Sequence, residues 1–269
     1  IEPETFNLDP ISIEKNITKY TKAIVVTNIF GHAAKLNEIM SIAKKYDLQV
    51  IEDNAQAPGA KYYNQYAGCI SDIGVFSLNY HKHIHTGEGG VCVTNNDVLA
   101  ERMQLIRNHA EAVVGGKGIK NLTNMIGFNF RMGEIEAAIG VEQLKKLPRF
   151  IETRRKNAKL FQSLFAEHPF IDIQQETGSS SWFGFSLILK EDAPYSRADL
   201  VKLLTKNGIE CRPIVTGNFL KNTEVLEYFD YEIAGTLEAS EYLDKHGLFV
   251  GNHQNDIEFE LKFLHEVLC

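Results

Sequence analysis

A lysine stands between histidines in the segment FSLNYHKHIHTGEGG, residues 76–90, and these side chains could do three kinds of chemistry. The alternating His81, His83 and His85 would put three imidazoles on one face of an extended chain, and imidazole is a good ligand for zinc or copper. The glycines that follow could instead cradle a phosphate. Lys82 could form a Schiff base with a carbonyl cofactor.

The pattern favours neither a metal site nor a nucleotide loop. The residues after the histidines provide no fourth ligand in sequence, and the histidines are also compatible with ordinary polar contacts near an anionic ligand. TGEGG matches neither GxxxxGKS/T nor GxGxxG, so its glycines are expected to turn the chain back into the next strand. We therefore predict no metal and give the lysine the main role.

Polar residues at predicted strand ends accompany Lys82. Asp53 ends one strand, Gln56 follows it, and Ser77 lies at the end of another. A pyridoxal phosphate site needs an amine for the Schiff base, a carboxylate that keeps the pyridine nitrogen protonated, and small donors around the phosphate. Taken alone, each residue has an ordinary structural explanation: the lysine could be a solvated surface side chain, and the carboxylate after a strand could cap the next turn. Together they indicate pyridoxal phosphate.

The elements that would position these residues follow from hydrophobic patterning. A short β-branched run, a helical pattern and a second buried run form a βαβ unit, which implies a parallel sheet with ligands bound at the carboxyl ends of its strands. Two further strands and a helix capped by Asn96 or Asp97 follow. The predicted ranges are strands 23–28, 48–53, 72–79 and 89–95, and helices 33–47 and 97–109.

Beyond residue 110 the short strands and helices give way to a glycine-rich stretch and one long helical pattern. Residues 111–122 are glycine-rich and expected to be mobile. A long helical pattern over 132–165 contains Pro148, where we expect a kink or a break. Beyond it, strand, helix and strand patterns predict a smaller α+β unit. We predict a large domain over 1–150, and over 151–269 an interdomain helix with the smaller domain; the later elements are a strand at 180–189, a helix at 196–208 and a strand at 209–214.

The composition of the chain gives no reason to expect nucleic acid or a membrane as a partner. The net charge of −7 on 269 residues gives no electrostatic reason to expect nucleic acid or an anionic membrane. No apolar run approaches the ~20 residues of a membrane helix, and the first residues lack the layout of a secretion signal. The cysteines are widely spaced, which suits reduced thiols in a cytoplasmic protein. They are Cys69, Cys92, Cys211 and Cys269.

Several ordered motifs resemble a known family. VIEDNAQAPGAKY, DIGVFSLNYHK, TGEGGVCVTNNDVLAERMQLIRNH and FNFRMGEIEAAIGVEQLKKL are similar to the nucleotide-sugar aminotransferases of the DegT/DnrJ/EryC1/StrS type. The resemblance covers residues 1–150 and, more loosely, the remainder. It implies the α/β fold of type I pyridoxal phosphate-dependent transferases, with a mainly parallel sheet in the large domain and a smaller α+β C-terminal domain. It also implies a homodimer with shared active sites.

The resemblance assigns roles residue by residue. Lys82 would form the Schiff base and shuttle the proton, and Asp53 would pair with the pyridine nitrogen. Gln56 would contact the ring hydroxyl, Ser77 would bind the phosphate, and Asn129 would reach the phosphate of the other subunit's cofactor. Candidate contacts for the sugar substrate are Arg131, His83, Trp182, Phe183, Arg212, Asn218, Asn252 and His253.

Two departures from the family pattern matter. Family members carry a further segment ahead of the first motif, with a phosphate loop and a ring-stacking aromatic residue. This chain starts without Met, and we expect it to begin partway through a longer protein; the alternative is a short gene product, whose cofactor affinity should be much lower. The distal motifs SSWFGFSLIL, RPIVTGNF and GLFVGNH are more similar to the sugar 3-dehydrases, which act on nucleotide-linked 4-keto-6-deoxy sugars and replace the lysine with histidine. The retained Lys82 favours aminotransfer.

We therefore predict a pyridoxal phosphate-dependent aminotransferase that moves an amino group, from glutamate as donor, to a keto-sugar on a nucleotide for polysaccharide or glycan synthesis. One alternative is 3-dehydration of a 4-keto-6-deoxy sugar. Another is a non-catalytic protomer of the same fold. The sequence names neither the sugar, nor the nucleotide, nor the carbon that is aminated.

Overall fold

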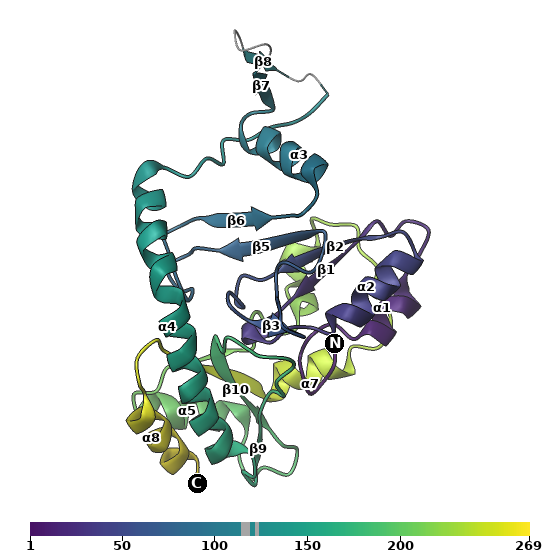
Figure 1. Ribbon diagram of the computed structural model, residues 1–269. Helices are drawn as coiled ribbons and strands as arrows, with labels where there is room; N and C mark the ends of the chain where they lie inside the picture. Colours follow the sequence, from purple (N-terminus) through teal and green to yellow (C-terminus); the bar gives the residue numbers. More distant parts are fainter. Residues whose placement is uncertain (114–118, 122–123) are drawn as a thin grey trace.

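The computed structural model describes residues 1–113, 119–121 and 124–269, and it contains two four-stranded sheets linked by one long helix (Figure 1). In the first sheet the strand order is β1-β2-β5-β6. Its strands are β1 Ala23–Thr27, β2 Gln49–Asp53, β5 Ile73–Ser77 and β6 Gly90–Val93. The second sheet follows the long helix in sequence and has the order β11-β12-β10-β9.

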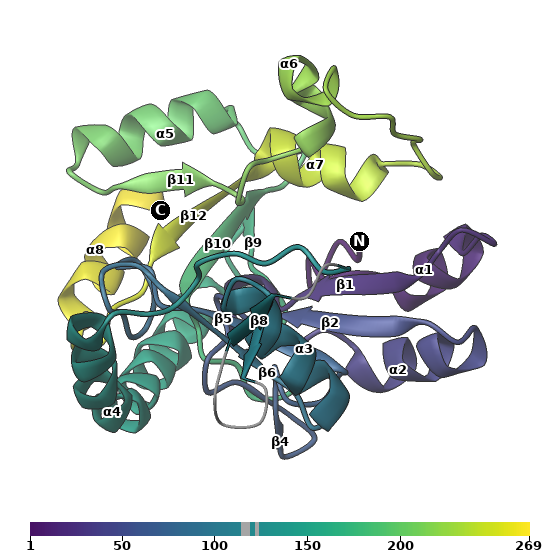
Figure 2. The ribbon, with the colours of Figure 1, turned by 90° about the horizontal axis from the view of Figure 1, so that it is seen from above.

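The βαβ unit of the first sheet confirms the predicted parallel pairing. β1 runs parallel to β2, with Thr27 opposite Asp53, and β2 runs parallel to β5, with Asp53 opposite Val75. Helix α2, Leu36–Lys45, connects β1 to β2 and buries Leu36, Ile39 and Ala43 against the sheet. Helix α1, Pro10–Asn16, lies beside α2 (Figure 2). This packing leaves the carboxyl ends of three parallel strands at one edge.

The last strand of the sheet reverses direction. β6 pairs antiparallel with β5, from Gly74 opposite Val93 to Ser77 opposite Gly90. The loop between them contains Lys82. A short hairpin, β3 Lys61–Tyr62 and β4 Gln65–Tyr66, fills the connection from β2 to β5, and a 3₁₀ turn, η1 Ile29–Gly31, follows β1.

Helix α3, Asp97–Arg107, is capped by the Asn96 side chain, which accepts hydrogen bonds from Val98 and Leu99 as its sequence predicts. The glycine-rich stretch after it contains an antiparallel pair that was not predicted, β7 Glu111–Val113 and β8 Ile119–Asn121. The predicted mobility of this stretch concerns mainly residues 114–118 and 122, which lie outside the described residues.

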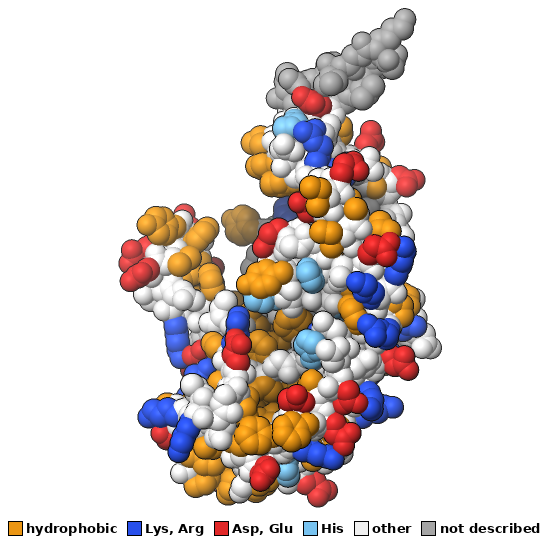
Figure 3. Space-filling model, turned by 90° about the vertical axis from the view of Figure 1, so that its left-hand side faces the viewer, with side chains coloured by type: hydrophobic (Ala, Val, Ile, Leu, Met, Phe, Trp, Pro, Cys, Tyr) orange, Lys and Arg blue, Asp and Glu red, His pale blue; other side chains and the backbone are white. Residues whose placement is uncertain are grey.

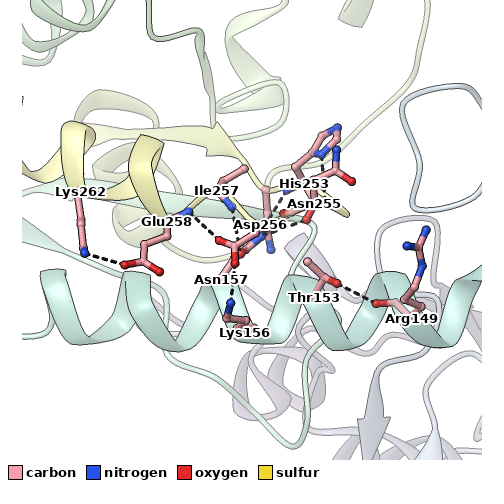
Figure 4. Close-up of polar contacts among 11 residues, drawn as sticks. Arg149, Thr153, Lys156, Asn157, His253, Asn255, Asp256, Ile257, Glu258 and Lys262 are labelled. Atoms are coloured by element: carbon pink, nitrogen blue, oxygen red, sulfur yellow. Dashed lines mark hydrogen bonds and ion pairs between the residues drawn. The ribbon is translucent and has the colours of Figure 1, made fainter.

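Helix α4, Glu134–Phe165, runs unbroken through Pro148. Of the predicted kink or break, the break is therefore wrong and the kink stays a prediction, since proline removes one backbone hydrogen bond. The second half of α4 packs on the body of the molecule through Phe150, Ile151 and the residues that follow, and this burial offsets the lost bond. Near its middle, Asn157 and Lys156 bind the turn that leads into α8, Glu258–Leu268 (Figure 4).

The second sheet is antiparallel and surrounded by helices. All six residues of strand β10 are buried, and the strand pairs with β12 and β9. Its core contains Phe161 and Phe165 of α4 together with Phe185, Leu187 and Leu248. The other elements are β9 Ile171–Asp172, β10 Gly184–Leu189, α5 Arg197–Lys206, β11 Cys211–Pro213, η2 Phe219–Lys221, α6 Thr223–Leu226, α7 Glu238–His246 and β12 Gly247–Gly251.

The boundary predicted at residue 150 falls inside α4, whose two halves differ. Residues 134–148 bury no side chain, whereas the half after Pro148 packs against the second sheet. The division into two domains stays a prediction. None of the described helices has the length and apolar character needed to span a bilayer.

Candidate active site

Two predicted site residues meet at the carboxyl edge of the first sheet. Asp53 is the last residue of β2, and Ser77 is the last of β5, which is the neighbouring strand. Backbone bonds continue across the edge, from the Asn28 amide to the Asp53 carbonyl at 3.0 Å and from the Asn54 amide to the Val75 carbonyl at 2.8 Å. The parallel pairing thus brings residues that are far apart in sequence to one side of the sheet.

Two adjacent carboxylates on β2 have different environments. Because side chains alternate along a strand, Glu52 and Asp53 point to opposite faces. The Glu52 side chain is fully buried and accepts hydrogen bonds from the backbone of Gly68, Ile70 and Ser71. Asp53 is partly exposed, and among the described residues its Oδ1 accepts only the local Ala55 amide, at 3.1 Å. Glu52 therefore organises the fold, and Asp53 is the carboxylate that can face a ligand.

Lys82 lies in a tight loop that returns from β5 to β6. Its backbone amide donates to the Asn79 carbonyl at 2.9 Å, and the Ser77 hydroxyl accepts the Asn79 amide at 3.3 Å. The half-buried Lys82 places Nζ 5.3 Å from the centre of the Phe183 ring. Burial lowers the pKa of Lys82, and the charge of Asp53 opposes this shift only in part. A lysine amine with a lowered pKa is a better nucleophile at neutral pH.

Lys82 and Asp53 influence each other electrostatically, but no ion pair joins them among the residues that the structure describes. A pyridoxal phosphate ring would bind between the two groups, because its aldehyde, which reacts with the amine, and its pyridine nitrogen, which pairs with the carboxylate, lie at opposite ends of the ring. An amine and a carboxylate at one edge, with a serine hydroxyl on the next strand, fit the donor set of that cofactor.

Gln56 approaches the same edge from the loop after β2. Its Oε1 accepts the amide of Phe30 at 2.8 Å, and the Phe30 carbonyl accepts the amide of Phe183 at 2.8 Å. Gln56 and the Phe183 ring are therefore connected through one residue of η1. The amide nitrogen of Gln56 has no hydrogen bond to any residue that the structure describes, which leaves this donor for a ring hydroxyl.

The structure places two of the predicted substrate contacts in the core. Trp182 is 3% exposed and packs edge-on against His32, with ring centres 4.4 Å apart. His83 is 2% exposed, and its Nε2 bonds the carbonyl of Ser181 at 3.1 Å. Both side chains pack beside the site and present almost no surface to solvent in this chain, so a substrate contact by either stays a prediction.

Two others lie on the outer side of the second sheet. Arg212 on β11 is exposed and bonds Glu210 at 2.8 Å. His253 follows β12 and accepts the Asn255 amide at its Nδ1, beside Asn157 in the second half of α4 (Figure 4). Among the described residues, no hydrogen bond connects either of them to the loop of Lys82. Their role as substrate contacts stays a prediction, as does that of Asn218, whose side chain caps η2.

Asn129 and Arg131 lie in an exposed segment before α4. Asn129 forms an isolated antiparallel bridge with Asn108, and Arg131 donates to the Asn108 side chain at 2.7 Å. Neither contacts the Lys82 loop in the described part of this chain. Their position suits contact with a second molecule, which is where the family resemblance puts Asn129.

Arg154 is a residue that the sequence interpretation missed. It is 4% exposed and donates from one nitrogen to the carbonyls of Trp182, Phe183 and Asn252. Desolvation lowers its pKa to about 10, so it stays charged at neutral pH. A signal was present, because Arg154 interrupts the apolar stripe formed by Phe150, Ala158 and Phe161 on α4.

Comparison with known proteins identifies the family of this chain. The family model described as the DegT/DnrJ/EryC1/StrS aminotransferase family matches residues 1–254. The chain belongs to this family. A GDP-4-keto-6-deoxy-D-mannose 3-dehydratase of Yersinia pseudotuberculosis is 47% identical over 281 aligned residues, which cover 100% of this chain and 72% of the relative.

Solved structures of family members agree with the fold. The E. coli GDP-4-keto-6-deoxy-D-mannose-3-dehydratase with bound hydrated PLP has a TM-score of 0.93 and 45% identity, over 100% of this chain and 72% of that one. A GDP-4-keto-6-deoxymannose-3-dehydratase with a trapped PLP-glutamate geminal diamine has the same score and identity, over 100% and 73%. This member of the family has the fold of type I pyridoxal phosphate enzymes, as predicted, and uses that cofactor.

The prediction of aminotransfer is wrong. The relatives that match the whole chain at 45–47% identity are 3-dehydratases. The prediction relied on one residue, Lys82, whereas the motifs of the second half pointed to the dehydrase branch. What is shown for this member of the family is that it is a pyridoxal phosphate-dependent sugar enzyme.

Proposed function

We propose that this chain catalyses the pyridoxal phosphate-dependent 3-dehydration of a 4-keto-6-deoxy sugar linked to GDP. The observation that carries the proposal is the 47% identity, over the full chain, to a GDP-4-keto-6-deoxy-D-mannose 3-dehydratase. The local geometry supports it, since an amine, a carboxylate and a hydroxyl lie at one sheet edge as the cofactor requires.

When bound, pyridoxal phosphate in its aminated form supplies an electron sink conjugated to the keto carbon, which allows the hydroxyl on the neighbouring carbon to leave. Asp53 would hold the pyridine nitrogen protonated. Gln56 would orient the ring through its hydroxyl, and Ser77 would donate to the phosphate. All three positions are fixed by backbone bonds at the strand ends or by η1.

Lys82 would have two tasks. Between turnovers its amine would hold the cofactor covalently, for which the lowered pKa and the half-buried setting are suited. During turnover the freed amine would accept a proton, and its ammonium form would donate that proton to the oxygen of the departing C3 hydroxyl. We take glutamate as the amino-acid donor, because a related 3-dehydratase was solved with a PLP-glutamate adduct.

Product analysis tests the reaction. The full chain would be incubated with pyridoxal phosphate, glutamate and GDP-4-keto-6-deoxymannose, and the sugar product weighed by mass spectrometry. We expect a product that has lost the C3 oxygen and gained no nitrogen. A product that keeps the hydroxyl and gains nitrogen, or no product at all, would contradict the proposal. The same sugar on dTDP serves as the control for the nucleotide.

The exposed apolar surface before and on α4 supports a homodimer. Residues 126–144 present large hydrophobic side chains to solvent, including Phe128 and Phe130, whose rings stack 4.9 Å apart. Hydrophobic side chains also gather on the upper part of the face in Figure 3. Contiguous patches of this kind mark interfaces. The exposed hydrophobic residues of this surface are Ile126, Phe128, Phe130, Met132, Ile135, Ile139, Val141 and Leu144.

A second copy of this chain is the partner that we propose for this surface. Asn129 lies within it, so pairing of two copies would let Asn129 reach the other subunit's cofactor phosphate. We expect the variant Ile135→Glu to elute as a monomer in size-exclusion chromatography with light scattering, because Ile135 is 76% exposed and a buried glutamate without a partner is costly. Phe259→Glu, at a 77% exposed site on α8, is the matched control and should leave the mass unchanged.

A further inference from the structure

The two sheets meet beside Lys82 at a short stretch that we call the junction segment, residues 180–183. Its backbone pairs with η1, from the Ser181 amide to the Gly31 carbonyl at 3.0 Å and from the Phe183 amide to the Phe30 carbonyl. Gly31 must be glycine here, because its φ is +92° and a Cβ would lie 2.7 Å from the Trp182 nitrogen. The segment is therefore held closely against the cofactor edge.

Arg154 fixes the other side of the junction segment. Its guanidinium bonds the carbonyls of Trp182 and Phe183, and the Asn252 side chain bonds the Trp182 carbonyl at 2.9 Å. Trp182 adopts φ 50°, a left-handed conformation that costs energy for a residue with a large side chain. Backbone strain of this kind persists where surrounding contacts over-determine it, and it is frequent at functional sites.

Buried polar atoms without a hydrogen-bond partner gather at this place in the described residues. They include both ring nitrogens of His32, Nδ1 of His83 and Oγ of Ser181. Native proteins rarely leave such atoms unsatisfied in a purely structural core. Together with the strained tryptophan, they indicate that the junction segment is arranged for the site rather than for stability alone.

His83 connects this segment to Lys82. Burial lowers the pKa of His83 to about 3, so the imidazole is neutral at working pH. A carbonyl oxygen can only accept, so the Nε2 that lies 3.1 Å from the Ser181 carbonyl must be the protonated nitrogen. The adjacent residue Lys82 places its amine over the Phe183 ring, and the same ring lies 5.7 Å from the His83 ring.

We propose that His83 is a positioning residue for Lys82. Its Nε2–H bond to the Ser181 carbonyl holds the loop of Lys82 against the junction segment, so that the Phe183 ring covers the lysine amine. This inference rests on the proposed function, in which Lys82 holds the cofactor. It distinguishes the two histidines that flank Lys82, since His81 is exposed and its ring lies tilted against that of Tyr80, with ring centres 3.8 Å apart.

Two substitutions separate the hydrogen bond from the ring volume. His83→Gln keeps a neutral donor that can reach the Ser181 carbonyl, whereas His83→Met keeps the length and removes the donor. Each full-length variant is titrated with pyridoxal phosphate and reduced with borohydride. The label at Lys82 is measured by peptide mass spectrometry, together with the visible circular dichroism of the bound cofactor.

We expect His83→Met to need about five- to tenfold more pyridoxal phosphate for half-labelling, as loss of one buried hydrogen bond implies, and to lose most of the visible dichroism. His83→Gln should restore both readouts to within about twofold of the parent. His81→Met is the matched control and should titrate like the parent. Titration of His83→Met like the parent, with unchanged dichroism, would overturn the inference.

If His83→Met does not fold, the variant Phe183→Leu tests the same contact from the other side. It keeps the His83 bond and removes the ring from Lys82, and it should also weaken labelling; parent-like labelling would overturn the role given to the ring. A parent that is not labelled at Lys82 refutes the assignment of Lys82 in the proposed function. A parent that is labelled, with every variant labelled equally, refutes the positioning role alone.

Discussion

The two sheets of this protein bury their side chains to very different extents. In the second sheet all six residues of β10 and three of the five residues of β12 are buried. In the first sheet β1 and β2 each bury two residues, and β6 buries none. The sheet with the smaller core is the one that positions Asp53, Ser77 and Lys82.

This difference suggests that the second sheet contributes most of the stability, whereas the first sheet positions the residues of the candidate site. Antiparallel strands surrounded by helices form one continuous core with Phe161, Phe165 and Leu200, which is where most of the unfolding free energy should reside. Parallel strands instead collect polar residues at their carboxyl ends. Substitutions in the two sheets should therefore change different measured quantities.

The largest effect is expected for Lys82→Ala. Losing an acid–base group should lower the rate of product formation by about 10²–10⁴-fold, and the borohydride-stable cofactor adduct should disappear. The midpoint of thermal unfolding should change little, because Lys82 is only half-buried. Lys61→Ala is the matched control, since Lys61 also lies over an aromatic ring, that of Tyr66, but away from the site. A stable adduct in Lys82→Ala would refute the assignment.

The sequence predicted the first sheet well because its signals are local. β-branched runs, the helix between them and the Asn96 cap all reappear within two or three residues of the predicted ends. The predicted parallel pairing also indicated the edge of the sheet, at the carboxyl ends of the strands, where Asp53 and Ser77 lie. Arg154 and the junction segment could not be predicted in the same way, because they depend on contacts between α4, residues 180–183 and Asn252, which are far apart in sequence.

The second expected effect tests the other sheet. Phe185→Ala should lower the free energy of unfolding by about 3–5 kcal/mol, because Phe185 is fully buried and stacks on Phe161 at 4.3 Å. Val91→Ala on β6, where the side chain is 42% exposed, should cost less than about 1 kcal/mol. Chemical denaturation followed by fluorescence measures both. Equal costs would mean that the two sheets contribute alike.

Two errors of sequence interpretation have physical causes. Pro148 predicted a kink or a break, and the break is wrong because packing of the residues after Pro148 keeps α4 continuous. Lys82 predicted aminotransfer, because the reaction was read from one nucleophile. The motifs of the second half pointed to the dehydrase branch, and the relatives that match the full chain agree with those motifs rather than with the single lysine.

The third effect concerns the place where the sheets meet. Burial holds the pKa of His32 and of His83 at about 3, below the ordinary value of 6.5. Because the unfolded chain binds protons that the folded chain does not, stability is complete above pH 6.5 and declines as the pH falls toward 3. Two such groups imply a slope of about 3 kcal/mol per pH unit within that window.

His32→Leu should remove about half of this contribution to the slope, measured as the free energy of unfolding at several pH values between 4 and 6. Carboxylates also titrate there, so the informative quantity is the difference between the variant and the parent. His81→Gln, at the exposed loop position, should leave the slope as it is in the parent. A His32→Leu slope equal to that of the parent would show that His32 is not held neutral by burial.

The smallest effect compares the same loss in two surroundings. Ser196 caps α5 through a capping box with Asp199, and α5 buries Leu200 and Leu204 in the second core. Asn96 caps α3, a helix with no buried residue in this chain. Ser196→Ala should therefore lower the global free energy of unfolding by about 1 kcal/mol.

Asn96→Ala should instead leave the global value nearly unchanged and raise only the local hydrogen-exchange rates of α3, because fraying of a helix without buried contacts does not propagate to the cores. Hydrogen exchange with mass spectrometry, combined with denaturation, distinguishes the two outcomes. If Asn96→Ala costs as much global stability as Ser196→Ala, then α3 is coupled to a core that this chain alone does not display. The second subunit of the proposed homodimer would be the first place to look for it, and repeating the comparison in Ile135→Glu would decide, since a monomer should lose that coupling.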